Sequence, residues 1–170
     1  MGTWINYYFV EDKDIKRAKQ QNKNVLDLHY ENRCNCTDKD CNCEWIIECF
    51  GTGVKSWDPT INLLKQMDKS IDQVIGEVLD LTGHRWIDAP SLEITSLNVK
   101  RVNIALMKIS DTDIDKVYSN KKLIEKIKNM PGYRMNDIEN RELVNLELEQ
   151  LRKAFKQATL KEMGIAIQCE

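Results

Sequence analysis

Apolar runs near both ends of the chain predict short strands. Residues 4–10 are aromatic and β-branched and are bounded by charge, which is typical of a buried strand. Residues 25–30 alternate well enough between apolar and polar side chains to predict a second strand. The apolar segment 165–169 predicts a last strand, and Gly164 before it is a natural C-cap for the preceding helix. The run at 44–50, which Gly51-Thr52-Gly53 ends, is too short to separate strand from helix.

Between these strands, apolar residues recur at spacings of three and four, which predicts amphipathic helices. A short polar helix is expected at 12–21, and Asp58-Pro59 can open the next one. Further helix starts are expected at Ser70, at Thr95 or Ser96, at the capping-box-like Ser110-Asp111-Thr112-Asp113, and after a break at Ser119-Asn120. The longest helix is expected at about 136–163, with a stripe of Val144, Leu148, Leu151, Phe155 and Ala158.

The chain of 170 residues fits one domain that spans residues 1–170 and is long enough to bury a sizeable core. No internal repeat or long linker interrupts it. The order of elements predicts an α+β fold, in which a small sheet from N-terminal strands and a C-terminal strand is packed by amphipathic helices.

Charge and hydropathy exclude several classes of partner. The chain carries 25 basic and 27 acidic residues, a formal net charge of −2, so neither nucleic acid nor an anionic membrane is expected to be attracted. No apolar run approaches the roughly 18 residues of a membrane helix, and the first residues lack the features of a signal peptide. We therefore expect a cytoplasmic protein, and the abundance of Lys, Asn and Ile suggests a bacterial or phage source. The oligomeric state does not follow from the sequence.

Four of the six cysteines fall within ten residues, at Cys34, Cys36, Cys41 and Cys43. Residues i and i+2 of an extended chain share a face, and a turn at 37–40 would place opposite Cβ atoms roughly 4.5 to 5.5 Å apart. Four thiolates gathered in this way predict a structural zinc site. Reduced or redox-labile thiols and a disulfide pair remain alternatives, and His29 could replace one sulfur, which would leave a mixed site with an open position.

A second candidate site is the loop His84-Arg85-Trp86, which is bounded by Gly83 and Pro90. A titratable ring, a forked cation and an aromatic plate together suit an anionic or planar ligand. This loop, together with Tyr7, Tyr8 and Trp45, is a candidate ligand-binding cleft. The alternative is a loop in which the Trp packs and the His and Arg are solvated.

Several short motifs follow one another in a characteristic order. They are Asn6-Tyr7-Tyr8, Leu26-Asp27-Leu28, Trp45, Thr52-Gly53, Arg85-Trp86, Ile94-Thr95, Ile109-Ser110, and a C-terminal helix and strand with Leu151, Phe155, Ala158 and Gly164-Ile165-Ala166-Ile167. In these motifs the chain resembles the YfbM-like bacterial family, domain of unknown function 1877. The resemblance covers most of the chain and implies a helical conformation for 45–50. Family members usually run from Leu-Asp-Leu to Trp within a few residues, so the resemblance implies that residues 31–44 here form a cysteine-rich insertion, which we expect to bind a metal.

The family supplies no established activity, and the chain has no Gly-rich phosphate loop, no G-x-S-x-G elbow and no H-E-x-x-H motif. We therefore expect a non-enzymatic interaction module of a bacterial or phage accessory protein, of the inhibitor or immunity type, which binds another protein and carries a structural zinc hairpin. The alternatives are a small-molecule-binding protein or enzyme that uses the cleft near His84-Arg85-Trp86, and a thiol-based redox or metal sensor.

Overall fold

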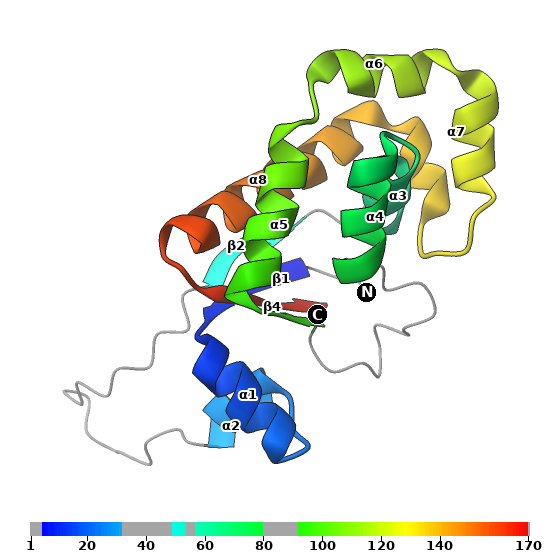
Figure 1. Cartoon of the computed structure of the whole chain (residues 1–170). Helices are drawn as coiled ribbons and strands as arrows, with labels where there is room; N and C mark the ends of the chain where they lie inside the picture. Colours follow the sequence, from blue (N-terminus) through cyan, green and yellow to red (C-terminus); the bar gives the residue numbers. More distant parts are fainter. Residues whose placement is uncertain (1–4, 32–48, 54–56, 80–91, 170) are drawn as a thin grey trace.

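The computed structural model of the protein describes residues 5–31, 49–53, 57–79 and 92–169 (Figure 1). The elements follow one another as β1 (Ile5–Val10), α1 (Asp12–Gln20), α2 (Val25–Glu31), β2 (Cys49–Gly53), α3 (Trp57–Lys65), α4 (Lys69–Val78), β3 (Leu92–Ile94), α5 (Ser96–Met107), α6 (Asp111–Ser119), α7 (Lys121–Lys128), the 3-10 helix η1 (Met135–Glu139), α8 (Arg141–Leu160) and β4 (Gly164–Cys169). The predicted α+β fold class is confirmed, with strands near both ends of the described chain and most helices between them.

The four described strands form one antiparallel sheet in the order β2-β1-β4-β3. Strand β1 pairs with the C-terminal strand β4 over six residues, from Ile5 opposite Cys169 to Val10 opposite Gly164. On its other edge β1 pairs with β2, where the register shifts between Asn6 and Tyr7 and leaves Gly51 without a residue opposite it. Residues 51–53 therefore belong to the bulged strand β2. The sequence analysis instead expected the apolar run to end at these residues.

Helices cover both faces of the sheet, which makes three layers (Figure 1). Because side chains alternate along a strand, Tyr7 and Phe9 of β1 face a main core shared with α3, α4, α5 and α8. Val10 of β1 and Ala166 of β4 face a smaller second core, which they share with α1 and α2. The stripe predicted for the longest helix is confirmed, since all five of its members are buried in the main core.

The prediction of a strand at 25–30 is wrong, because this segment is helix α2. Asn24 begins the helix: its Oδ1 accepts a hydrogen bond from the Asp27 backbone N–H at 2.8 Å, the contact of an N-cap. One helical turn buries Val25, Leu26 and Leu28 together against the sheet. Six residues are too few to separate the two periodicities, and Asn24-x-x-Asp27 was the available signal.

Two features at the C-terminal end also differ from the sequence prediction. The helix expected from about 136 is split, because Asn140 caps a new helix by accepting from the Leu143 backbone N–H at 3.3 Å, and η1 precedes it. Gly164 is the first residue of β4 instead of a C-cap, and the left-handed residue after α8 is Glu162 with φ of 57°. Strand β3, which the sequence analysis did not predict, pairs with β4 over only three residues.

Two carboxylates cap helices that belong to other segments. Asp12, at the start of α1, accepts from the backbone N–H and the hydroxyl of Ser96 at 2.8 and 2.6 Å, so it serves the N-terminus of α5. Glu93 of β3 accepts from the backbone N–H of Val25 at the start of α2. Helices α1 and α2 are therefore joined to the β3–α5 segment by two caps, one in each direction. Burial raises the pKa of the Glu93 carboxyl.

Within the described residues, no helix has the length and apolarity that a membrane crossing requires.

Two glycines offer a matched test of this packing. A Cβ at position 164 would lie 2.6 Å from the Ile94 carbonyl oxygen and 2.9 Å from Ile15 Cδ1, whereas a Cβ on Gly76 in α4 would meet nothing within 4 Å. We expect Gly164→Ala to lower the free energy of unfolding by about 1–3 kcal/mol through overpacking. Gly76→Ala should raise it by about 0.5–1 kcal/mol through helix propensity and reduced chain entropy. Urea denaturation of both variants measures the difference, and equal effects would contradict the close approach of β3 to β4.

Candidate functional site

Most of the residues predicted for a functional site lie outside the described residues. These are Cys34, Cys36, Cys41, Cys43, Trp45, His84, Arg85 and Trp86. Within the described segments, no group of three or more His, Cys, Asp or Glu side chains is arranged to hold a metal ion. The zinc hairpin of the 31–44 insertion and the ligand-binding loop therefore stay predictions.

The two tyrosines predicted to line a cleft are described, and they point to opposite faces of β1. Tyr7 is fully buried in the main core, where its ring lies 6.3 Å from that of Trp57. Tyr8 is partly buried against the second core. Neighbouring residues of a strand project to opposite sides, so these two side chains do not meet in one cleft.

Tyr7 makes a fully buried side-chain hydrogen bond to a distant segment of the chain. Its hydroxyl donates to Glu147 Oε1 of α8 at 3.0 Å, and neither side chain is exposed to solvent. Burial, together with the charge and the hydrogen bond of Glu147, raises the pKa of Tyr7 well above its usual value. Tyr7 therefore stays a neutral donor, and Glu147 has a partner for one of its oxygens.

A buried ionisable pair of this kind is a frequent mark of a functional site, but it also occurs as a structural element. Because both side chains are closed to solvent, a ligand has no access to them in this arrangement. The pair joins the central strand β1 to the longest helix. We assign it a structural role, and the accessible candidate sites lie elsewhere.

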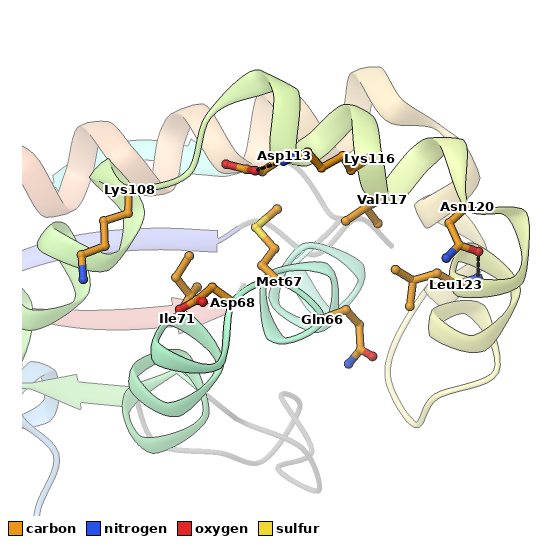
Figure 2. Close-up of a pocket in the computed structure, with 10 residues that line it drawn as sticks. All are labelled: Gln66, Met67, Asp68, Ile71, Lys108, Asp113, Lys116, Val117, Asn120 and Leu123. Carbon is orange, nitrogen blue, oxygen red and sulfur yellow. Dashed lines mark hydrogen bonds and ion pairs between the residues drawn. The ribbon is translucent and has the colours of Figure 1, made fainter.

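An open pocket of about 510 Å³ lies between the α3–α4 connection and α6 (Figure 2). We call it the α3–α7 pocket. It is lined by Gln66, Met67, Asp68, Ile71, Lys108, Asp113, Lys116, Val117, Asn120 and Leu123. Figure 2 shows Met67 rising from the α3–α4 connection toward α6, with Val117 facing it. The volume is in the range of pockets that hold small ligands.

The charged groups of the α3–α7 pocket are mostly held by their own neighbours. Asp113 belongs to the confirmed capping box of α6, and the hydrogen bonds from Ser110, with Lys116 at 3.0 Å, lower the pKa of its carboxyl to about 2. Asp68 caps α4 by accepting from the Ser70 backbone N–H at 2.8 Å, and the bonds from Ser70 lower its pKa. The Lys108 ammonium has no hydrogen-bond or ion-pair partner among the described residues.

A second accessible feature is an apolar surface on α5. Leu97, Ile104 and Met107 are 68%, 57% and 76% exposed. Spacings of seven and three residues place all three on the outward face of this helix, opposite the buried Val102 and Leu106. We call these three residues the α5 stripe. Half of the large apolar side chains that are exposed in the described structure belong to it.

Sequence reasoning missed both of these features. For the α5 stripe a signal existed, because α5 carries more apolar residues than one buried face accommodates. For the α3–α7 pocket no local signal existed, since its walls come from segments that are up to 57 residues apart, Gln66 and Leu123. Only the packing of α6 and α7 over the α3–α4 connection brings them together.

The Tyr7–Glu147 bond predicts a specific response to alkaline pH. Because the folded pKa of Tyr7 is raised, its contribution to stability is complete below the unfolded pKa of about 10 and is lost as the pH rises beyond it. We expect Tyr7→Phe to destabilise the protein by about 1–3 kcal/mol at pH 7, because it removes the buried donor. Above pH 10 the difference from the wild type should shrink by about 1.4 kcal/mol per pH unit.

Val144→Ala is the matched control, since it truncates a buried side chain of α8 without removing a titratable group. Its free-energy difference from the wild type should stay constant between pH 7 and 11. Denaturant titrations at several pH values measure both variants. A Tyr7→Phe difference that stays as constant as that of the control would contradict the assigned bond.

Comparison with known proteins places nearly the whole chain in one family. No curated protein and no solved structure matches the sequence. The family model described as a domain of unknown function (DUF1877) matches residues 1–167, which include every described element except the last two residues of β4. The chain therefore belongs to the family of the domain of unknown function DUF1877.

Proposed function

We propose that the protein is a non-enzymatic interaction module that binds another protein. The observation that carries this proposal is the α5 stripe, in which Leu97, Ile104 and Met107 are each more than half exposed on one helix face. Scattered exposed apolar residues need no explanation, but several on one face typically mark a binding surface. Anchors on one side of a helix are the arrangement by which helices dock into apolar grooves of partners.

The polar residues beside the stripe indicate the charge of the partner. Helix α5 and its C-cap residue carry Lys100, Arg101 and Lys108 and no acidic residue. Arg101 forms an ion pair with Glu77 at 2.5 Å, and Lys100 lies 3.8 Å from Glu162, so these two are partly neutralised. Lys108 forms no ion pair with any described residue. A partner with an apolar groove and an acidic rim complements this surface.

The zinc hairpin is the second part of the proposal. Four thiolates at Cys34, Cys36, Cys41 and Cys43 would fix the 31–44 insertion locally, as a structural zinc ion does in small hairpins. An insertion pinned in this way would add a second rigid surface to the module. The inhibitor or immunity type of accessory protein fits a small chain that presents rigid surfaces to a protein target.

The α5 stripe is tested with the double variant Ile104→Ser/Met107→Ser. A partner is first isolated from a lysate of the source organism by its retention on the immobilised wild-type protein. The purified partner is then titrated by calorimetry with the wild type and with the double variant. We expect the double variant to bind that purified partner at least tenfold more weakly, because central apolar anchors contribute about 2 kcal/mol or more each. Both positions are exposed, so the melting temperature should change little.

Tyr133→Ser is the matched control, since Tyr133 is 51% exposed but lies in the segment before η1. It should bind the partner as the wild type does. Equal affinity of the stripe variant and the wild type would contradict the assignment of the surface. Turnover of a nucleotide or peptide library by the pure, zinc-loaded protein would contradict the non-enzymatic part.

The metal is tested by elemental mass spectrometry of the purified, reduced protein. We expect one zinc per chain, lost in Cys34→Ser/Cys36→Ser and kept in Cys169→Ser, which removes a cysteine outside the cluster. Chelation should leave the helical circular dichroism nearly unchanged, because the described members of the main core are large in number and lie outside the insertion. If the freshly reduced protein contains no metal, the zinc proposal is wrong and redox chemistry of the clustered thiols takes its place.

A further inference from the structure

The α3–α7 pocket retains unused hydrogen-bond donors, because internal bonds occupy its amide acceptors. Gln66 Oε1 accepts from Lys126 Nζ at 2.7 Å, and Asn120 Oδ1 accepts from the Leu123 backbone N–H at 3.1 Å. These contacts also fix the orientation of both amides, since an acceptor must face each donor. Among the described residues, the Gln66 and Asn120 NH2 groups and the Lys108 ammonium have no hydrogen-bond acceptor.

The pocket offers fewer free anionic groups than free hydrogen-bond donors. Asp113 is ion-paired with Lys116, which leaves Asp68 as the lining carboxylate without an ion-pair partner among the described residues. Lys108 attracts Asp68 but does not reach ion-pair distance, and Asp68 also faces the positive end of the α4 dipole. A complementary ligand therefore needs several acceptors, one of them charged, and fewer donors.

The remaining wall is apolar and firmly supported. Ile71 and Val117 belong to the main core, and Met67 and Leu123 pack against it. The backbone next to Lys108 is also held, because Arg152 of α8 donates to the carbonyl of Ile109 at 2.7 Å. An apolar side chain of a ligand would cover this wall, and Met67 can adapt to its shape.

We propose that the α3–α7 pocket binds a short peptide segment that ends in a free C-terminal carboxylate and carries apolar side chains. The carboxylate accepts from Lys108, backbone carbonyls accept from the amides of Gln66 and Asn120, and a backbone N–H donates to Asp68. A peptide supplies all of these groups together with apolar side chains, whereas a simple fatty acid lacks the carbonyl and N–H groups. The inference rests on the proposed function, since such a segment would be the C-terminus of the partner.

The test uses three probes on the full-length protein: acetyl-alanyl-leucyl-leucine, the same tripeptide with a C-terminal amide, and octanoate. Amide chemical-shift changes in two-dimensional NMR locate the binding, and calorimetry measures the affinity. We expect the tripeptide acid to shift residues of the pocket wall and to bind about tenfold or more tightly than the amide, because a charge-assisted hydrogen bond is lost with the carboxylate. Octanoate should bind more weakly than the tripeptide acid.

Lys108→Met should lower the affinity for the tripeptide acid about tenfold, and Lys108→Arg should keep this affinity within about threefold of the wild type. Lys122→Met, on α7 but outside the pocket lining, should leave it unchanged. No shifts at the pocket, or equal binding of acid and amide, would overturn the proposal. Equal binding of octanoate and the tripeptide acid would overturn the peptide class.

Failure of this inference is distinguishable from failure of the proposed function. The α5 stripe is tested with variants at Ile104 and Met107, which do not line the pocket. Loss of partner binding in those variants with no peptide binding would leave the interaction module standing without this site.

Discussion

The pairing of β1 with β4 is the constraint on which the rest of the described structure depends. It joins the first and last strands of the chain, and β1 also carries β2 on its other edge. Both faces of β1 are covered, by the main core at Tyr7 and Phe9 and by the second core at Val10. The strand therefore satisfies its backbone through two ladders and buries its side chains in two cores, so that both helical layers are built against it.

Polar contacts between layers set the direction in which the helices lie on this sheet. Apolar burial stabilises the layers but is not directional, whereas the bonds from Tyr7 to Glu147 and from Ser96 to Asp12 each need one arrangement. The cap that Glu93 gives to Val25 acts in the same way on the opposite layer. Each of these bonds satisfies a group that would otherwise be costly to bury or to leave at a helix end.

The two accessible features adjoin one another along α5. The α5 stripe reaches Met107, and Lys108, the next residue, lines the α3–α7 pocket. A partner that covers the stripe would therefore place its neighbouring segment within reach of the pocket. The stripe would contribute most of the apolar contact area. The pocket would contribute selectivity, because its unpaired donors discriminate against ligands without matching acceptors.

The sequence by itself determined two strands, which it predicts at 4–10 and 165–169 and which the structure describes as Ile5–Val10 and Gly164–Cys169. It also determined helix stripes such as Val144–Ala158 and the capping box at Ser110, because periodicity and caps are local properties. Tertiary structure decided that 25–31 is a helix and that 92–94 is a strand, since both depend on contacts with distant residues, Glu93 with Val25 and Ile94 with Ile165. It also directed Tyr7 into the main core and Tyr8 toward the second core on the opposite face of β1, so that the two side chains do not line one cleft. The α3–α7 pocket depends entirely on packing, because a cavity is a property of the space between helices and none of its lining segments carries it alone.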